Sequence, residues 1–169
     1  MFQDALSRLA RAWPVIAVVD GLFATALSIL AYDSTATRLW QSVASTLLGP
    51  AAFEGGARTA LVGLAMHAGV ALLWSAVFVA LYVLSPRLQR LVATPAGAVA
   101  AAAVYGPLVW IVMSFVVVPA LTGRPPTIGA RWWVQAAGHV VFVALPIVLM
   151  TRRGGPAPRP AARPTASAA

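Results

Sequence analysis

Four long apolar segments are the feature that most restricts how this chain can fold. They cover residues 14–32, 59–84, 96–121 and 132–150. A helix of about 20 residues crosses the ~30 Å hydrocarbon core of a bilayer. Only 9% of the residues are charged and 60% are hydrophobic, whereas soluble domains are nearer one-quarter charged. The sequence therefore predicts an all-α integral membrane protein, built as a bundle of four transmembrane helices.

The chain of 169 residues is long enough for one such bundle and too short for a second domain. Residues 1–153 are predicted to form the membrane domain. Residues 154–169 are rich in proline, alanine and arginine, a composition typical of a disordered segment. We expect this tail to lie in the cytoplasm.

The positions of the arginines predict the orientation. All twelve basic residues are arginines, and cytoplasmic loops carry the excess of positive charge. Four spans place eight of them on one side and four on the other, so both termini should be cytoplasmic, in a bacterial inner membrane. The first set is Arg8, Arg11, Arg87, Arg90, Arg152, Arg153, Arg159 and Arg163, and the second is Arg38, Arg58, Arg124 and Arg131. No nucleic-acid-binding motif accompanies this charge, so nucleic acid is not an expected partner.

The first outer loop contains a further helical pattern over residues 35–48. Leu39, Trp40 and Val43 fall on one helical face together with Leu47 and Leu48. Such an amphipathic segment predicts a short periplasmic helix that lies in the membrane interface, with Trp40 at headgroup depth.

Three ionisable residues fall inside the predicted spans, where charge is costly and a functional role is the default hypothesis. They are Asp20, His67 and His139. Asp20 lies six residues into the first span, so we expect it about 10 Å below His67, beyond hydrogen-bond reach. Glu54, in the outer loop, is then the better acidic partner for His67. Asp20 is expected to relay a proton or cation, to hydrogen-bond to a neighbouring helix through a residue such as Tyr105, or to reach the inner interface.

Both histidines belong to stripes with a spacing of four residues. The first stripe is Thr59, Gly63, His67, Ala71 and Ser75, the second is Arg131, Gln135 and His139, and the third span carries Ala98, Ala102, Gly106, Trp110 and Ser114. Small and polar residues on one helical face are typical of contacts between transmembrane helices. Two histidines at matched depth are compatible with three functions: binding of haem b or a divalent metal, a proton-sensitive gate, or separate structural histidines.

The sequence also resembles a group of small uncharacterised bacterial inner-membrane proteins with four spans. The resemblance rests on the segment 48–56, on Gly63, His67 and Tyr82, on Tyr105, Gly106, Trp110, Met113 and Pro119, and on His139 with Leu145 and Pro146. It covers residues 14–153. It implies the four-span topology and carries over no reaction.

No signature of a soluble enzyme is present, so the first expectation is a non-enzymatic structural or accessory component of the membrane, with no cofactor. The second is a small homo-oligomeric transporter or channel subunit for protons or small ions, with Asp20, His67 and His139 on its path. A bis-histidine haem or metal binder is the third. The lipid bilayer is the common partner of all three.

Overall fold

The computed structural model describes residues 2–152, and every regular element in this range is helical. Four helices are long and apolar enough to cross a membrane, which confirms the predicted all-α four-helix transmembrane bundle. Their bounds are Phe2–Ala31, Gly56–Leu84, Pro95–Thr122 and Ala130–Arg152. The predicted tail at 154–169 lies outside the described residues.

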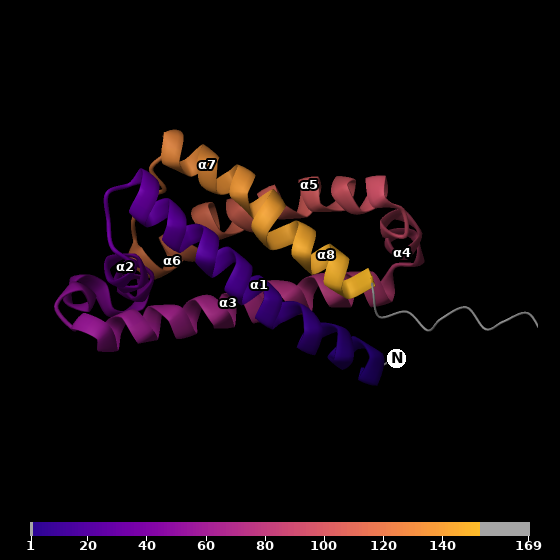
Figure 1. Ribbon diagram of the computed structural model, residues 1–169, viewed down its shortest axis with the longest axis horizontal. Coiled ribbons are helices and arrows are strands. Elements are labelled where there is room, and N and C mark those ends of the chain that lie inside the picture. Colours follow the sequence, from indigo (N-terminus) through magenta and orange to yellow (C-terminus); the bar gives the residue numbers. More distant parts are fainter. Residues whose placement is uncertain (1, 153–169) are drawn as a thin grey trace, which may run out of the picture.

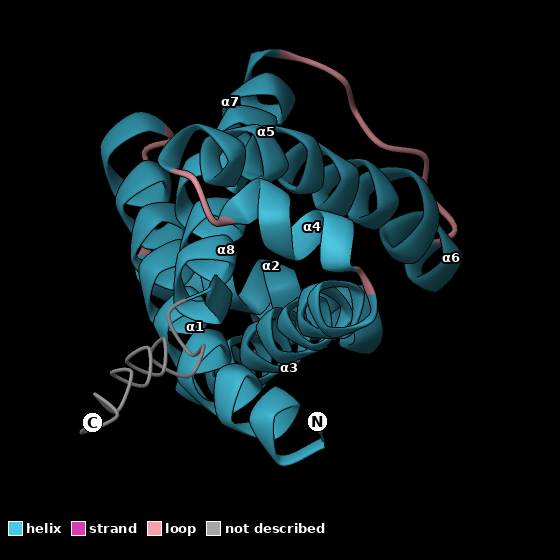
Figure 2. Ribbon diagram, turned by 90° about the vertical axis from the view of Figure 1, so that its right-hand side faces the viewer, coloured by secondary structure: helices cyan, strands magenta, loops and turns pink. Residues whose placement is uncertain are grey.

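The four helices run up and down, so residues 2 and 152 lie at the same end of the bundle (Figure 1). We call this the termini end. Helix α4 (Pro86–Val92) connects α3 (Gly56–Leu84) to the third span there (Figure 2). The opposite end holds α2 (Ala36–Leu48), and we call it the α2 end.

The first helix begins much earlier than predicted. Helix α1 spans Phe2–Ala31, so Pro14 lies in its interior and does not start it. Residues 2–13 contain many strong helix formers. Their helix is also held at its inner face, where Arg8 and Ala12 are buried. The arginines that precede Pro14 are therefore part of the helix.

The third and fourth spans each contain one π-helical turn, and each turn is followed by a proline. The third span comprises α5 (Pro95–Val112), the π turn η2 (Met113–Val117) and α6 (Val118–Thr122). The fourth comprises α7 (Ala130–Gly138), the π turn η3 (His139–Ala144) and α8 (Leu145–Arg152). Pro119 and Pro146 lack the N–H of the regular helical bond and crowd the carbonyl four residues earlier. The wider turn makes room for the ring, as single π turns in helices do.

Helix α2 forms within one residue of its predicted start, but it packs differently from the prediction. The Thr35 hydroxyl caps it by accepting the Arg38 N–H at 3.1 Å. The helix crosses α3 so closely that a side chain on Gly63 would collide with the Trp40 carbonyl. The Trp40 ring lies 5.2 Å from the His67 ring, inside the bundle. The prediction that Trp40 points to the headgroups is wrong, because Gly63 has no side chain and α2 therefore packs directly on the backbone of α3.

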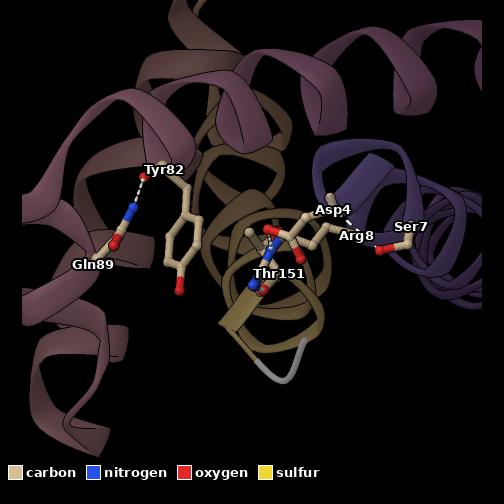
Figure 3. A network of polar contacts seen from close by, with 6 residues as sticks. All are labelled: Asp4, Ser7, Arg8, Tyr82, Gln89 and Thr151. Atoms are coloured by element: carbon tan, nitrogen blue, oxygen red, sulfur yellow. Dashed lines mark hydrogen bonds and ion pairs between the residues drawn. The ribbon is translucent and has the colours of Figure 1, made fainter. Parts of the chain in front are cut away.

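Arg8 holds three helices together at the termini end (Figure 3). Arg8 is buried, with 4% of its side chain exposed. It forms an ion pair with Asp4 at 2.9 Å and donates a hydrogen bond to the Thr151 carbonyl at the end of α8. Its guanidinium also lies over the Tyr82 ring of α3, 5.0 Å from the centroid. Arg8 therefore links α1, α3 and α8 in addition to its predicted role in topology.

Replacing Arg8 with methionine is expected to lower the free energy of unfolding by about 1.5–3 kcal/mol, the usual range for hydrogen bonds to a charged group. Denaturant unfolding of the purified protein in micelles measures the change. Arg11→Met is the matched control, since Arg11 is exposed one turn further along the same helix. Equal stability of the two variants would contradict a structural role for the Arg8 contacts.

Candidate functional site

A cavity of about 930 Å³ opens into the bundle from the α2 end. All four spans and α2 contribute to its walls, and most of the lining is apolar. Below it, toward the termini end, the bundle is closed by buried side chains, among them Ile16, Phe78 and Ile147. The cavity is thus closed toward the termini end. Its size lies in the range of pockets that bind small molecules, about 300–1,000 Å³.

Asp20, His67 and His139 all line this cavity. The structure therefore brings together, from three different spans, the three ionisable residues that the sequence placed inside the membrane. Gln135, the predicted neighbour of His139, lines it as well. Ser75 does not; it is fully buried in the helix packing, and its hydroxyl has no hydrogen-bond partner among the described residues.

Asp20 lies beside His67, with 3.8 Å between its Oδ2 and the imidazole Nδ1. The prediction of a 10 Å gap between them is wrong because the first span was counted from Pro14. Asp20 is eleven residues from the outer end of α1 at Ala31, and His67 is eleven residues from the outer end of α3 at Gly56. The helices are antiparallel, so equal counts give equal depth.

The other candidate partners make different contacts. Glu54 is exposed, so the prediction that it serves as the acid beside His67 is wrong: Asp20 holds that position. Tyr105 donates its hydroxyl to the Trp74 carbonyl at 2.6 Å and so is not the partner of Asp20.

The contacts of His67 determine which of its nitrogens faces Asp20. Nε2 lies 3.0 Å from the Ala17 carbonyl, which only accepts hydrogen bonds, so Nε2 carries a proton. In neutral imidazole Nδ1 is then an acceptor. A carboxylate is also only an acceptor, so two deprotonated groups would face each other unfavourably. A proton on either group would remove this repulsion and leave the pair with no net charge; the 3.8 Å separation itself is longer than a hydrogen bond.

His139 is oriented by its own helix. Its Nδ1 lies 2.8 Å from the Gln135 carbonyl and donates to it, so Nε2 is the nitrogen left without a partner among the described residues. Its ring packs on Trp110, with 4.7 Å between the centroids. His139 is also the first residue of the π turn η3, and Ser114 occupies the second position of the π turn η2. Both π turns therefore place a polar residue on the cavity wall.

Sequence analysis missed several polar residues of the cavity. Ser114 appeared only as part of a packing stripe, yet it is 8% exposed and lines the cavity. Arg124 and Arg131, assigned to topology, lie along its outer part. The i+4 stripe from Arg131 through Gln135 to His139 was the available signal, since it carries one helical face from the rim to the depth of the site.

The same geometry bears on metal binding. Within residues 2–152, no three side chains of histidine, cysteine, aspartate or glutamate come together as a group that could hold a metal ion. Asp20, His67 and His139 share the cavity without forming such a ligand group. Binding of haem b by the two histidines stays a prediction.

Comparison with protein-family models, with curated proteins and with solved structures gives no match for this chain. The assignment of a function rests on the cavity and its polar residues.

Proposed function

We propose that this is a proton-linked transporter of a small solute in the bacterial inner membrane. The solute occupies the cavity at the α2 end, and the Asp20–His67 pair binds or releases a proton as it does so. The observation that carries the proposal is the location of this pair on the wall of a large cavity, at 3.8 Å separation.

The pair is suited to proton exchange because both side chains reach the cavity while they are largely shielded from solvent. The side chains of His67 and Asp20 are 13% and 16% exposed, so both are largely shielded from solvent while they reach the cavity. Ionisable groups inside a membrane are rare and mark ion and proton paths. A second proton bound by the pair, or loss of the shared one, leaves a net charge in the cavity. That charge attracts or repels a charged solute, and so it couples proton binding to solute binding.

The architecture supports alternating access. The cavity lies toward the α2 end, and the bundle is closed at the termini end, where Arg8 contacts both α3 and α8. A transporter needs such a one-sided cavity in each of its end states. The π turns η2 and η3 interrupt the third and fourth spans beside the cavity. Interruptions of this kind frequently occur at functional sites.

The arginine bias supports a cytoplasmic position for the termini end and a periplasmic opening of the cavity. We expect a reporter that is active only in the cytoplasm to be active when fused to either terminus. Activity at one terminus alone would contradict a four-span topology.

The transport proposal is tested by recording charge movement in proteoliposomes adsorbed to a solid-supported membrane. Organic anions, organic cations and neutral solutes are applied as three panels over a range of pH. At least one panel is expected to give a pH-dependent transient current. His67→Gln is expected to reduce this current at least tenfold, because the ring that takes up and releases the proton is lost. Glutamine retains a donor near the Ala17 carbonyl and removes the titrating ring.

Glu54→Gln is the matched control, since Glu54 is an exposed acid at the α2 end with no ion pair among the described residues. Its currents should equal those of the wild type. Absence of a pH-dependent current with all three panels, together with absence of any solute-driven pH change inside the liposomes, would refute proton-linked transport. Equal currents in His67→Gln and wild type would refute the role of the pair.

A further inference from the structure

We infer that the solute is a single-chain amphiphilic organic anion, that is, a carboxylate carried on an apolar body. This inference rests on the proposed function for the site and adds the chemical class of its ligand. Three observations carry it: the net charge of the cavity, its excess of hydrogen-bond donors and its apolar length.

The charged side chains on the cavity wall favour an anion. They are Asp20, His67, His139, Arg124 and Arg131. With one proton on the pair, as the proposed function has it, Asp20 and His67 contribute no net charge. Arginine is always protonated in proteins, so the two guanidinium groups give the cavity a net charge of about +2 with neutral His139. Neither arginine has an acidic side chain within ion-pair distance in the described part of the chain. Their counter-charge can therefore come from a ligand.

The polar groups of the wall are mainly donors. Three tryptophans line the cavity, Trp74, Trp110 and Trp132, and each has a buried indole N–H without an acceptor among residues 2–152. An indole nitrogen can only donate, and so can a guanidinium. The nine-tenths buried Ser114 adds a hydroxyl without a hydrogen bond in the described range. A ligand that supplies acceptors and few donors complements such a wall, which is the chemistry of a carboxylate.

The contacts of Arg131 leave the edge of its guanidinium group free to bind a carboxylate. Its guanidinium stacks on the Tyr32 ring at 4.2 Å from the centroid. Stacking uses a face of the planar group, while carboxylates bind along its edge through two parallel hydrogen bonds. The headgroup of the ligand is thus assigned to Arg131, with Arg124 nearby on the cavity rim.

The apolar body fits below the headgroup. Arg131 and His139 are eight residues apart on one helical stretch, about 12 Å at 1.5 Å per residue. Between these depths the wall is formed largely by aliphatic, methionine and tryptophan side chains. A single alkyl or aryl chain reaches from the rim to the Asp20–His67 pair.

Quenching of tryptophan fluorescence tests this class, because bromine on a ligand quenches nearby indoles. The full-length protein in phosphatidylcholine nanodiscs is titrated with 11-bromoundecanoate, 11-bromoundecanol and 11-bromoundecyl-trimethylammonium. Saturable quenching is expected for the carboxylate, at least tenfold tighter than for the alcohol or the cation. The double variant Arg124→Gln/Arg131→Gln should weaken carboxylate binding by 10- to 100-fold. Arg58→Gln, an exposed arginine of the same end outside the cavity lining, should leave it unchanged.

Equal or tighter binding of the cation, or equal affinities of the double variant and Arg58→Gln, would overturn the inference. A pH-dependent current with the cation panel alone would keep proton-linked transport and reject the anion. Saturable carboxylate binding with neither a pH-dependent current nor a carboxylate-driven pH change inside the liposomes would keep the anion and reject proton-linked transport. If phosphatidylglycerol in the nanodisc abolishes carboxylate binding and itself alters the fluorescence in an arginine-dependent way, the anion is a lipid headgroup and the solute assignment is overturned.

Discussion

Replacing Asp20 with asparagine is expected to reduce the pH-dependent current by about 100-fold or more, the effect usual for a group that takes up or gives up a proton. Asparagine has nearly the same shape and its amide can donate to Nδ1 of His67, 3.8 Å away from the acid in the wild type. The pair keeps its contact and loses the proton that it shares. Because a buried acid is replaced by a neutral group, the bundle should remain folded.

Solid-supported membrane recordings of wild type and Asp20→Asn between pH 5 and pH 8 measure this effect. The residual current of the variant should no longer depend on pH. Its unfolding transition in micelles should lie at or above that of the wild type, since the cost of an ionisable group in the bilayer is removed. A pH-dependent current of wild-type size in Asp20→Asn would show that the proton is carried elsewhere.

The second large effect is expected at Gly106, where α5 touches the π turn that carries His139. A Cβ atom on Gly106 would lie 2.7 Å from both the His139 carbonyl oxygen and the Val140 nitrogen. These are backbone atoms, so the helices must separate to accept it. Gly106→Ala is expected to lower the free energy of unfolding by about 1–3 kcal/mol, and Gly106→Leu by about 3 kcal/mol or more.

Gly69 offers the matched control within α3. It is exposed on the bundle surface, and a Cβ there meets no atom of the described protein within 4 Å. Gly69→Ala should therefore stabilise the helix by up to about 1 kcal/mol, the difference in helix propensity. Denaturant unfolding in micelles compares the two positions. If both glycines respond alike to alanine, the close contact between α5 and η3 is not present in the membrane protein.

A side chain at Gly106 should also disturb ligand binding in the cavity. The atoms that collide with the new side chain belong to His139 and Val140, at the start of the π turn. Gly106→Ala should thus weaken saturable binding of 11-bromoundecanoate, whereas Gly69→Ala should not. The position of His139 depends on a glycine in a neighbouring span that does not itself line the cavity.

Hydropathy and short motifs were enough for the number of spans and for α2, although not for the start of α1. Spans are determined by length and mean hydropathy, which are properties of one continuous segment. The start of α2 near residue 35 and the start of the third span near residue 96 needed only the residues next to each helix end. The packing stripes followed from periodicity alone: Gly63, Ala71 and Ser75 are all buried, as predicted.

The positions of the π turns could not be predicted from the neighbouring residues alone. Pro119 and Pro146 each follow a π turn, yet Pro14 and Pro107 lie within regular α-helix. Proline removes a hydrogen bond in all four places, but whether the helix bends or widens depends on the packing around it. The sequence therefore marks candidate sites for irregular turns and does not choose among them.

By itself, the sequence determined that this chain forms four membrane-spanning helices with Asp20, His67 and His139 inside them, because hydropathy and helical period act within each segment. Only the tertiary structure decided that Asp20 and His67 form a pair and that both share a cavity with His139. Contacts between helices depend on their relative register, which is set by where each helix truly begins and by close approaches such as those at Gly63 and Gly106. These quantities belong to pairs of distant segments, and no single segment encodes them.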